Sequence, residues 1–408
     1  MKFSTTSTTA SFTQPPKPKH YFLAQPHQPF FLFGVLWAIV SMVLFTLSHK
    51  GMVVLSIEEN IFHLYSLAFI VFTQFFHGFL FTTFPRFCMS DTIEQKHYTP
   101  IVWLYEVAAL LFFIGAMTSA WVVFIAMIGI LLAHLMALIT LLLLYREGKT
   151  PHKSDPFWIL IAHAFGIAAN AMLVLVYGMG LVGISIYLFS LSPIIVNLFL
   201  VFMTFIAAQR MIPFFSHSFE IRPKYFVGKV FTFLVAKTLF SLLMIPFAEA
   251  IVSILLSLYL FLEFLSWKLP LFRSSAILWI LYLALFWLPT ALFIGGLTQL
   301  IEVFTDTVWL FAGTHLLVLG FVTTVLIGFG TRVTLGHSGQ PPHADTLAII
   351  LFLWTQVVVL GRFALSADSA LGGFNPWTFD AVSFVWIVLF VVWGARYGNI
   401  LLFGKTRT

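Results

Sequence analysis

Hydrophobic residues run along this chain in long stretches, and short polar loops separate them. A helix needs about 20 apolar residues to cross the hydrocarbon core of a bilayer, and stretches of this length recur from end to end. They predict an all-α, polytopic integral membrane protein with about twelve transmembrane helices. The expected spans are residues 30–47, 61–84, 101–118, 120–145, 157–177, 183–206, 226–244, 249–266, 276–297, 309–330, 345–366 and 382–403.

The loops between these spans are too short to hold a soluble domain, so residues 30–403 are expected to form a single transmembrane bundle. Residues 1–29 are polar, rich in Ser, Thr, Pro and Lys, and lack the apolar stretch of a cleaved signal peptide. We expect them to form a disordered cytoplasmic tail, and residues 404–408 to form a second cytoplasmic tail.

The positive charges predict the orientation of the bundle. Of the 21 Lys and Arg residues, 18 fall on the side of the N-terminus, Lys50 and Arg362 fall on the other side, and Lys237 lies within a span. Cytoplasmic loops carry an excess of Lys and Arg, so both termini are expected in the cytoplasm. The charge of +6 is spread over short loops, which argues against a nucleic-acid partner.

Composition supports the membrane interpretation and narrows the chemistry. The chain is 60% hydrophobic and 9% charged, whereas soluble proteins carry about 25% charged residues. The single cysteine, Cys88, excludes an internal disulfide, a cluster held by several thiolates and the two-cysteine attachment of a c-type haem. Any metal site must therefore depend mainly on histidine.

Five of the 13 histidines fall inside predicted spans. A polar ring in hydrocarbon costs free energy, and neutral imidazole binds iron, copper and zinc well, so a metal or haem site is one explanation. By depth, His63 and His315 lie near the outer face and could share one metal or haem. His77, on the same face of its helix as His63, forms a deeper layer with His134 and His163, which His337 could cap.

Two alternatives stay open. An isolated histidine within a membrane is often a hydrogen-bonding partner between helices, particularly His134 or His163 taken alone. Lys237 is expected to pair with Glu249 or Glu263, either for packing or as part of a proton relay. Such a relay, with the histidines, would fit a proton-coupled secondary transporter or a metal-ion transporter.

Several stretches resemble the NnrS family of bacterial membrane proteins. "THLLVLG" (residues 314–320) and "TRVTLGHSGQP" (residues 331–341) are close to the family's His-Leu-Leu-x-x-Gly and Thr-Arg-Val-x-Leu-Gly-His-Thr-Gly-Arg-Pro. "QPFFLFG" (residues 28–34), "GFLFTTFPRF" (residues 78–87) and "QRMIPFF" (residues 209–215) are similar to its other conserved segments. The second span departs from the family's Trp-His-Ala-His-Glu-Met, because Tyr65 and Ser66 follow His63 in place of the second His and the Glu.

The resemblance implies a multi-pass protein of the bacterial inner membrane that carries haem b and copper. It implies a role in nitric oxide metabolism or nitrosative-stress resistance, and leaves open whether the protein is an enzyme acting on nitric oxide or iron-nitrosyl species. Nitric oxide or another small ligand, the lipid bilayer, and an electron donor or quinone are the expected partners. His63, His315 and Tyr65 would bind the cofactors, and Arg332 would either hold a haem propionate or serve as a plain topology anchor.

Overall fold

The computed structural model describes residues 21–184, 191–218, 223–270, 273–373 and 375–404, and over these residues the chain is helical, without a strand. The elements are η1 (Tyr21–Leu23), α1 (His27–His49), α2 (Glu59–Tyr65), η2 (Ser66–Phe72), α3 (Thr73–Cys88), α4 (Gln95–Thr118), α5 (Ala120–Glu147), α6 (Ser154–Leu181), η3 (Ile194–Val201), α7 (Phe202–Phe215), α8 (Phe226–Leu242), α9 (Pro246–Ser266), α10 (Ala276–Phe304), α11 (Ala312–His315), η4 (Leu316–Thr323), α12 (Thr324–His337), α13 (Thr346–Ala370) and α14 (Pro376–Phe403).

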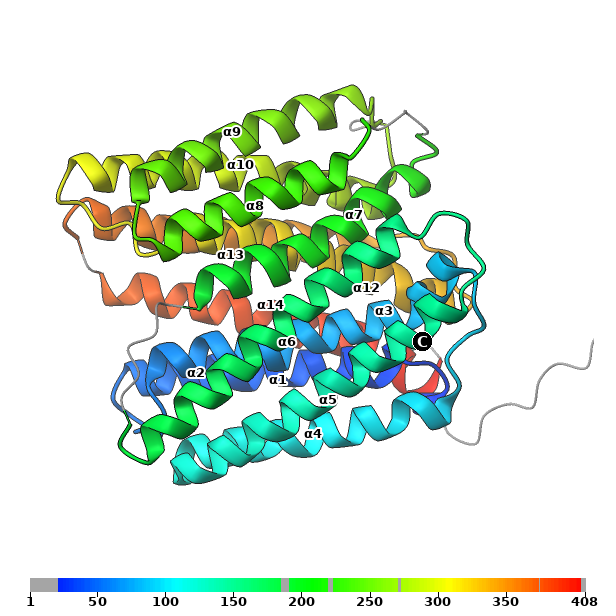
Figure 1. Ribbon diagram of the computed structural model, residues 1–408, viewed down its shortest axis with the longest axis horizontal. Helices are drawn as coiled ribbons and strands as arrows, with labels where there is room; N and C mark the ends of the chain where they lie inside the picture. Colours follow the sequence, from blue (N-terminus) through cyan, green and yellow to red (C-terminus); the bar gives the residue numbers. More distant parts are fainter. Residues whose placement is uncertain (1–20, 185–190, 219–222, 271–272, 374, 405–408) are drawn as a thin grey trace, which may run out of the picture.

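The predicted all-helical membrane protein is confirmed. Eleven helical segments of the described chain are long and apolar enough to cross a membrane. They correspond to eleven of the expected spans, and the remaining one, residues 226–244, corresponds to the 17-residue α8. The long helices lie side by side with their axes roughly along one direction (Figure 1).

The chain ends differ from the expected tails. The first span begins at His27 rather than at residue 30, and η1 precedes it and packs against α14. Residues 21–29 therefore belong to the bundle, while residues 1–20 and 405–408 lie outside the described residues. We call the end of the bundle that holds η1 and the last turn of α14 the terminal face, and the other end the opposite face.

Three spans form the centre of the molecule, and each contains a π-helical segment. In Glu59–Cys88, Ile194–Phe215 and Ala312–His337, 83–89% of the residues in the most apolar window are buried, against 28–56% in the other eight candidate spans. Their π-helical segments are η2, η3 and η4, and η3 contacts both of the others. Wide π turns occur often at functional sites, which directs attention to these three helices.

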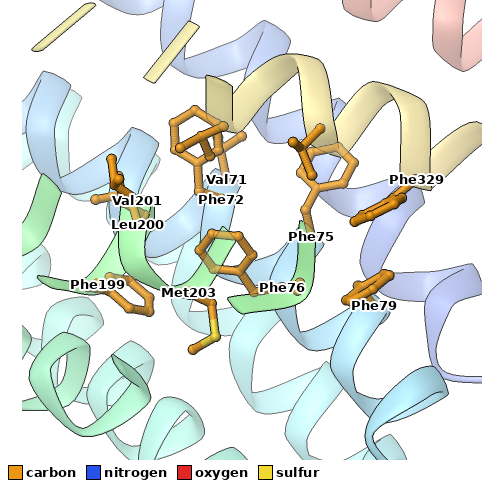
Figure 2. Packing of buried hydrophobic residues seen from close by; sticks show 14 of the residues in the cluster. Val71, Phe72, Phe75, Phe76, Phe79, Phe199, Leu200, Val201, Met203 and Phe329 are labelled. Carbon is orange, nitrogen blue, oxygen red and sulfur yellow. The ribbon is translucent and has the colours of Figure 1, made fainter. Parts of the chain in front are cut away.

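Aromatic side chains fill the space between the central helices. Figure 2 shows Phe76 beside Phe199 and Met203, and Phe79 stacked on Phe329. Gly166 of α6 permits this packing, because a Cβ at Gly166 would lie 2.6 Å from the Phe199 ring. The close approach places Phe199 deep in the core, next to the histidines described below.

Candidate metal centres

Three histidines from three different helices meet in the core. His77 lies in α3, His134 in α5 and His163 in α6, and all three side chains are fully buried. Their ring centroids are 5.5 Å apart for His77 and His134, 5.4 Å for His77 and His163, and 4.6 Å for His134 and His163. One nitrogen of each ring lies within 4.8 Å of the others, so this group could bind a metal ion.

The hydrogen bonding of the three rings supports this use. None of their six nitrogens makes a hydrogen bond with the described residues. A buried polar group without a partner costs about 1–3 kcal/mol, so hydrogen bonding between helices does not account for the cluster. A metal ion would bond one nitrogen of each ring, and neutral imidazole is the form that binds it.

The surroundings of the three histidines are aromatic. The Phe199 ring lies 5.6 Å from that of His134, and the Tyr105 ring lies edge-on to His77 at 5.7 Å. The Tyr105 hydroxyl donates to the Phe69 carbonyl and is thereby engaged elsewhere. Among the described residues, no carboxylate or thiol belongs to the group. The donor set consists of neutral nitrogen ligands.

His63 and His315 both lie near the opposite face, where α2 and α11 begin. Arg362 in α13 donates to the Leu310 carbonyl, in the turn that leads to His315. His63 stacks on Phe45 of α1 with a centroid distance of 4.2 Å. His315 Nδ1 lies 3.0 Å from the Phe311 carbonyl oxygen, which can only accept, so Nδ1 carries the proton and Nε2 is left as the ligand nitrogen.

The two groups are separate. His77 follows His63 by 14 residues, which is about 21 Å along a helix. Both rings contact α1, His63 through Phe45 and His77 through Phe30, and His77 also contacts α5 and α6. The seven-residue η2 lies between them, and the two rings lie at different depths of the bundle. His77 therefore cannot replace a ligand beside His63.

Tyr65 is engaged between α5 and α6. Its hydroxyl donates to Asn170 Oδ1 at 3.0 Å and lies 3.3 Å from the Met127 carbonyl oxygen. The side chain is fully buried there. Since positions two apart on a helix point in nearly opposite directions, Tyr65 does not share the surroundings of His63. Its role is to join helices, and the structure gives it no place at the outer pair.

His337 and Arg332 both lie toward the terminal face. His337 is outside the three-histidine group, and its ring lies 5.0 Å from that of His27, so the expected cap over the inner layer is wrong. The Arg332 guanidinium lies over the Phe215 ring at 3.9 Å. Arg332 follows His315 by 17 residues, about 25 Å along the helix, so it cannot reach a propionate of a haem held at His315.

Sequence reasoning missed two residues, one close to His315 and one beside His337. Arg362 was counted only as a charge on the outer side, yet it lies within α13, donating to the Leu310 carbonyl at 2.8 Å and to Ser366 Oγ at 2.6 Å. His27 was assigned to the tail, yet its side chain is 2% exposed. A basic residue on the side that is otherwise poor in Lys and Arg was the available signal for Arg362.

Comparison with known proteins agrees with the sequence resemblance. The chain matches the NnrS protein family over residues 21–403, which includes every histidine of the two groups. No curated protein matches the chain. Because the family match covers nearly the whole sequence, this chain belongs to the NnrS protein family.

Proposed function

We propose that this chain is a metalloprotein of the bacterial inner membrane that binds copper at His77, His134 and His163, binds haem b at His63 and His315, and acts on nitric oxide. Family membership supports a nitric-oxide-related membrane protein at the level of the family. The observation that carries the proposal is the buried three-histidine group whose six ring nitrogens lack hydrogen bonds among the described residues.

The charge of the inner group favours copper in its cuprous state. Imidazole suits zinc, copper, iron and nickel alike, so the ligand type alone does not select the metal. The cost of moving an ion into a medium of low dielectric constant is large and rises with its charge. Three neutral ligands in an apolar core offset that cost more easily for a monovalent ion than for a divalent one.

His63 and His315 are the residues that would hold the haem. His315 Nε2 is oriented by the bond from Nδ1 to the Phe311 carbonyl, which is the usual arrangement of a metal-bound histidine. Arg362 donates to the Leu310 carbonyl close to His315 and is the cation that would pair with a propionate, in place of Arg332. The haem would supply an iron able to bind a small ligand or pass electrons.

The membrane setting fits the proposed ligand. Nitric oxide is small and uncharged, so it can reach a metal centre in an apolar bundle from the surrounding lipid. We place the terminal face in the cytoplasm, because 18 of the 21 Lys and Arg residues belong to that side. His63, His315 and Arg362 then lie toward the outer face.

Metal and haem content of the purified full-length protein tests the proposal. We expect about one copper per chain, lost in His134→Leu and in His163→Leu. We expect a haem absorption band that shifts when nitric oxide is added and is lost in His63→Ala and His315→Ala. His152→Ala, in an exposed loop, is the matched control and retains both. Full copper content in both His134→Leu and His163→Leu would contradict the proposed copper site. Full haem content in both His63→Ala and His315→Ala would contradict the proposed haem site.

A secondary transporter is the competing function, and one observation favours it. Lys237 pairs with Glu249, as one of the two expected pairings, at 2.5 Å in a cavity near the opposite face. Glu263 instead accepts from the Trp267 indole at 2.9 Å. Reconstituted protein that contains no copper or haem but moves protons or metal ions across liposomes would support the transporter in place of the metalloprotein.

A further inference from the structure

A cavity of about 540 Å³ lies beside the central helices, and its wall includes Phe311 and Thr314, close to His315. It is enclosed by the beginning of η3, the end of α8, the beginning of α9, the end of α10 and the segment that leads into α11. These ends all lie toward the opposite face of the bundle. The volume is within the range of about 300–1,000 Å³ that is typical of small-molecule sites.

Polar groups concentrate in one part of the cavity wall. Lys237 Nζ lies 2.5 Å from Glu249 Oε1, and Gln299 Nε2 donates to Glu249 Oε2 at 2.8 Å. Asn197 also lines the cavity, and its Nδ2 donates to Thr238 Oγ1 at 3.2 Å. Trp309 also lines the cavity, and its buried indole N–H has no acceptor among the described residues.

Apolar side chains form much of the remaining wall and remain accessible from outside the bundle. Met244 and Phe311 both line the cavity, and their exposed fractions are 74% and 77%. Val308, which also lines it, is 56% exposed. Large exposed apolar side chains in a membrane protein face lipid or its interface, so a ligand that enters here must itself be compatible with lipid.

We propose that this cavity binds the head group of a lipid-soluble quinol or quinone. Lys237 and Glu249 neutralise each other, and Gln299 satisfies the second carboxylate oxygen, so the head group that fits beside them is neutral. A zwitterionic lipid head group would have to break this pair. Quinol hydroxyls can donate to Glu249 or Asn197, quinone oxygens can accept from Lys237 or Trp309, and the ring and tail match the apolar wall.

The position of η3 connects this cavity with the inner metal centre. Asn197 lines the cavity, and Phe199, two residues further along η3, packs against His134. Residues two apart lie on nearly opposite sides of a helix, so the thickness of one helix, about 10–12 Å, separates the two sites. The link to redox chemistry rests on the proposed function, since a quinol is an electron donor that resides in the bilayer.

Binding of a short-chain benzoquinone to the full-length protein tests the inference. The protein is reconstituted in phosphatidylcholine nanodiscs without native quinone, and decylbenzoquinone, in its oxidised and reduced forms, is titrated while tryptophan fluorescence is recorded. We expect saturable binding of one molecule per chain. Ser241→Phe narrows the cavity and keeps both partners of the ion pair, and Glu249→Gln removes the carboxylate. Each should weaken binding at least about tenfold, or about 1.4 kcal/mol.

Asp155→Asn is the matched control, because it removes a different ion pair, with Arg210 at 2.9 Å, that does not line the cavity. It should bind quinone as the unaltered protein does. Unsaturable partitioning, or equal affinity in Ser241→Phe and Glu249→Gln, would overturn the site. Tight retention of phosphatidylethanolamine that these variants abolish, without quinone binding, would assign the cavity to lipid instead. Metal content of the same samples separates this result from failure of the proposed function.

Discussion

The three buried histidines lead to a prediction about His134→Leu: it should stabilise the protein without copper and destabilise it relative to the unaltered protein with copper. In His134→Leu, a side chain with two buried ring nitrogens that lack partners is replaced by one of similar volume without polar atoms. An unsatisfied buried polar group costs about 1–3 kcal/mol, so without copper the variant should be more stable than the unaltered protein by about that amount.

With copper bound, the unaltered protein should be more stable than His134→Leu. A ligand that binds only the folded state at 1,000 times its dissociation constant stabilises that state by about 4.1 kcal/mol. This gain applies to the protein with all three ligands, and it exceeds the 1–3 kcal/mol advantage of the variant. The unaltered protein should therefore unfold at a higher temperature than His134→Leu when cuprous ion is supplied, and at a lower temperature when it is chelated.

The assay is thermal unfolding of the purified protein in detergent, followed by intrinsic fluorescence. One series contains buffered cuprous ion under reducing conditions, and the other contains chelator alone. His152→Leu in the exposed loop is the control and should follow the unaltered protein in both series. The three histidines would not be metal ligands if copper stabilised His134→Leu and the unaltered protein equally, or if the variant were less stable than the unaltered protein in chelator.

Three further predictions concern other parts of the bundle. Arg362→Met should lower haem retention, since it removes the cation close to His315, and absorbance at the haem band measures it. Gly313→Leu should lower the unfolding midpoint, because a Cβ at Gly313 would lie 2.7 Å from the Gly295 Cα, and parallel thermal scans measure the difference. Asp345 caps α13. Burial raises the Asp345 pKa, but the Ala348 N–H and Arg396 lower it by more, so the pKa lies below its usual value. Asp345 therefore contributes stability above its unfolded pKa of about 3.9, and this contribution is lost as pH falls through its lower folded pKa; Asp345→Asn should flatten that acid dependence and cost up to about 1 kcal/mol.

Depth along the membrane normal was accessible from the sequence. Each helix rises by a fixed amount per residue, so counting from the predicted ends placed His77, His134 and His163 in one layer and His63 with His315 in another. The structure brings His77, His134 and His163 together in one group, and places His63 in α2 and His315 in α11, both near the opposite face. The pairing of Lys237 with one of two acidic residues was predictable for the same reason, because an unpaired charge within a membrane is costly.

Direction around each helix was not accessible in the same way. Tyr65 turns toward Asn170, and His337 turns toward His27, although both were expected near other histidines. For His337 a cause is visible in η4, where π turns change the angular position of every residue that follows. Tyr65 precedes η2, and its hydroxyl is held between α5 and α6. No hydropathy pattern marks these segments, since they are as apolar as the α-helices around them.

The amino-acid sequence by itself determined that the chain is an all-helical membrane protein, because long apolar stretches can satisfy their backbone groups in a bilayer only as helices. It also determined the depth at which the histidines of the predicted spans lie. Only the tertiary structure decided which of these side chains face one another, which grouped His77 with His134 and His163 and formed a cavity beside Lys237 and Glu249. Those outcomes depend on how neighbouring helices rotate and pack, and that is fixed by contacts among residues far apart in the sequence.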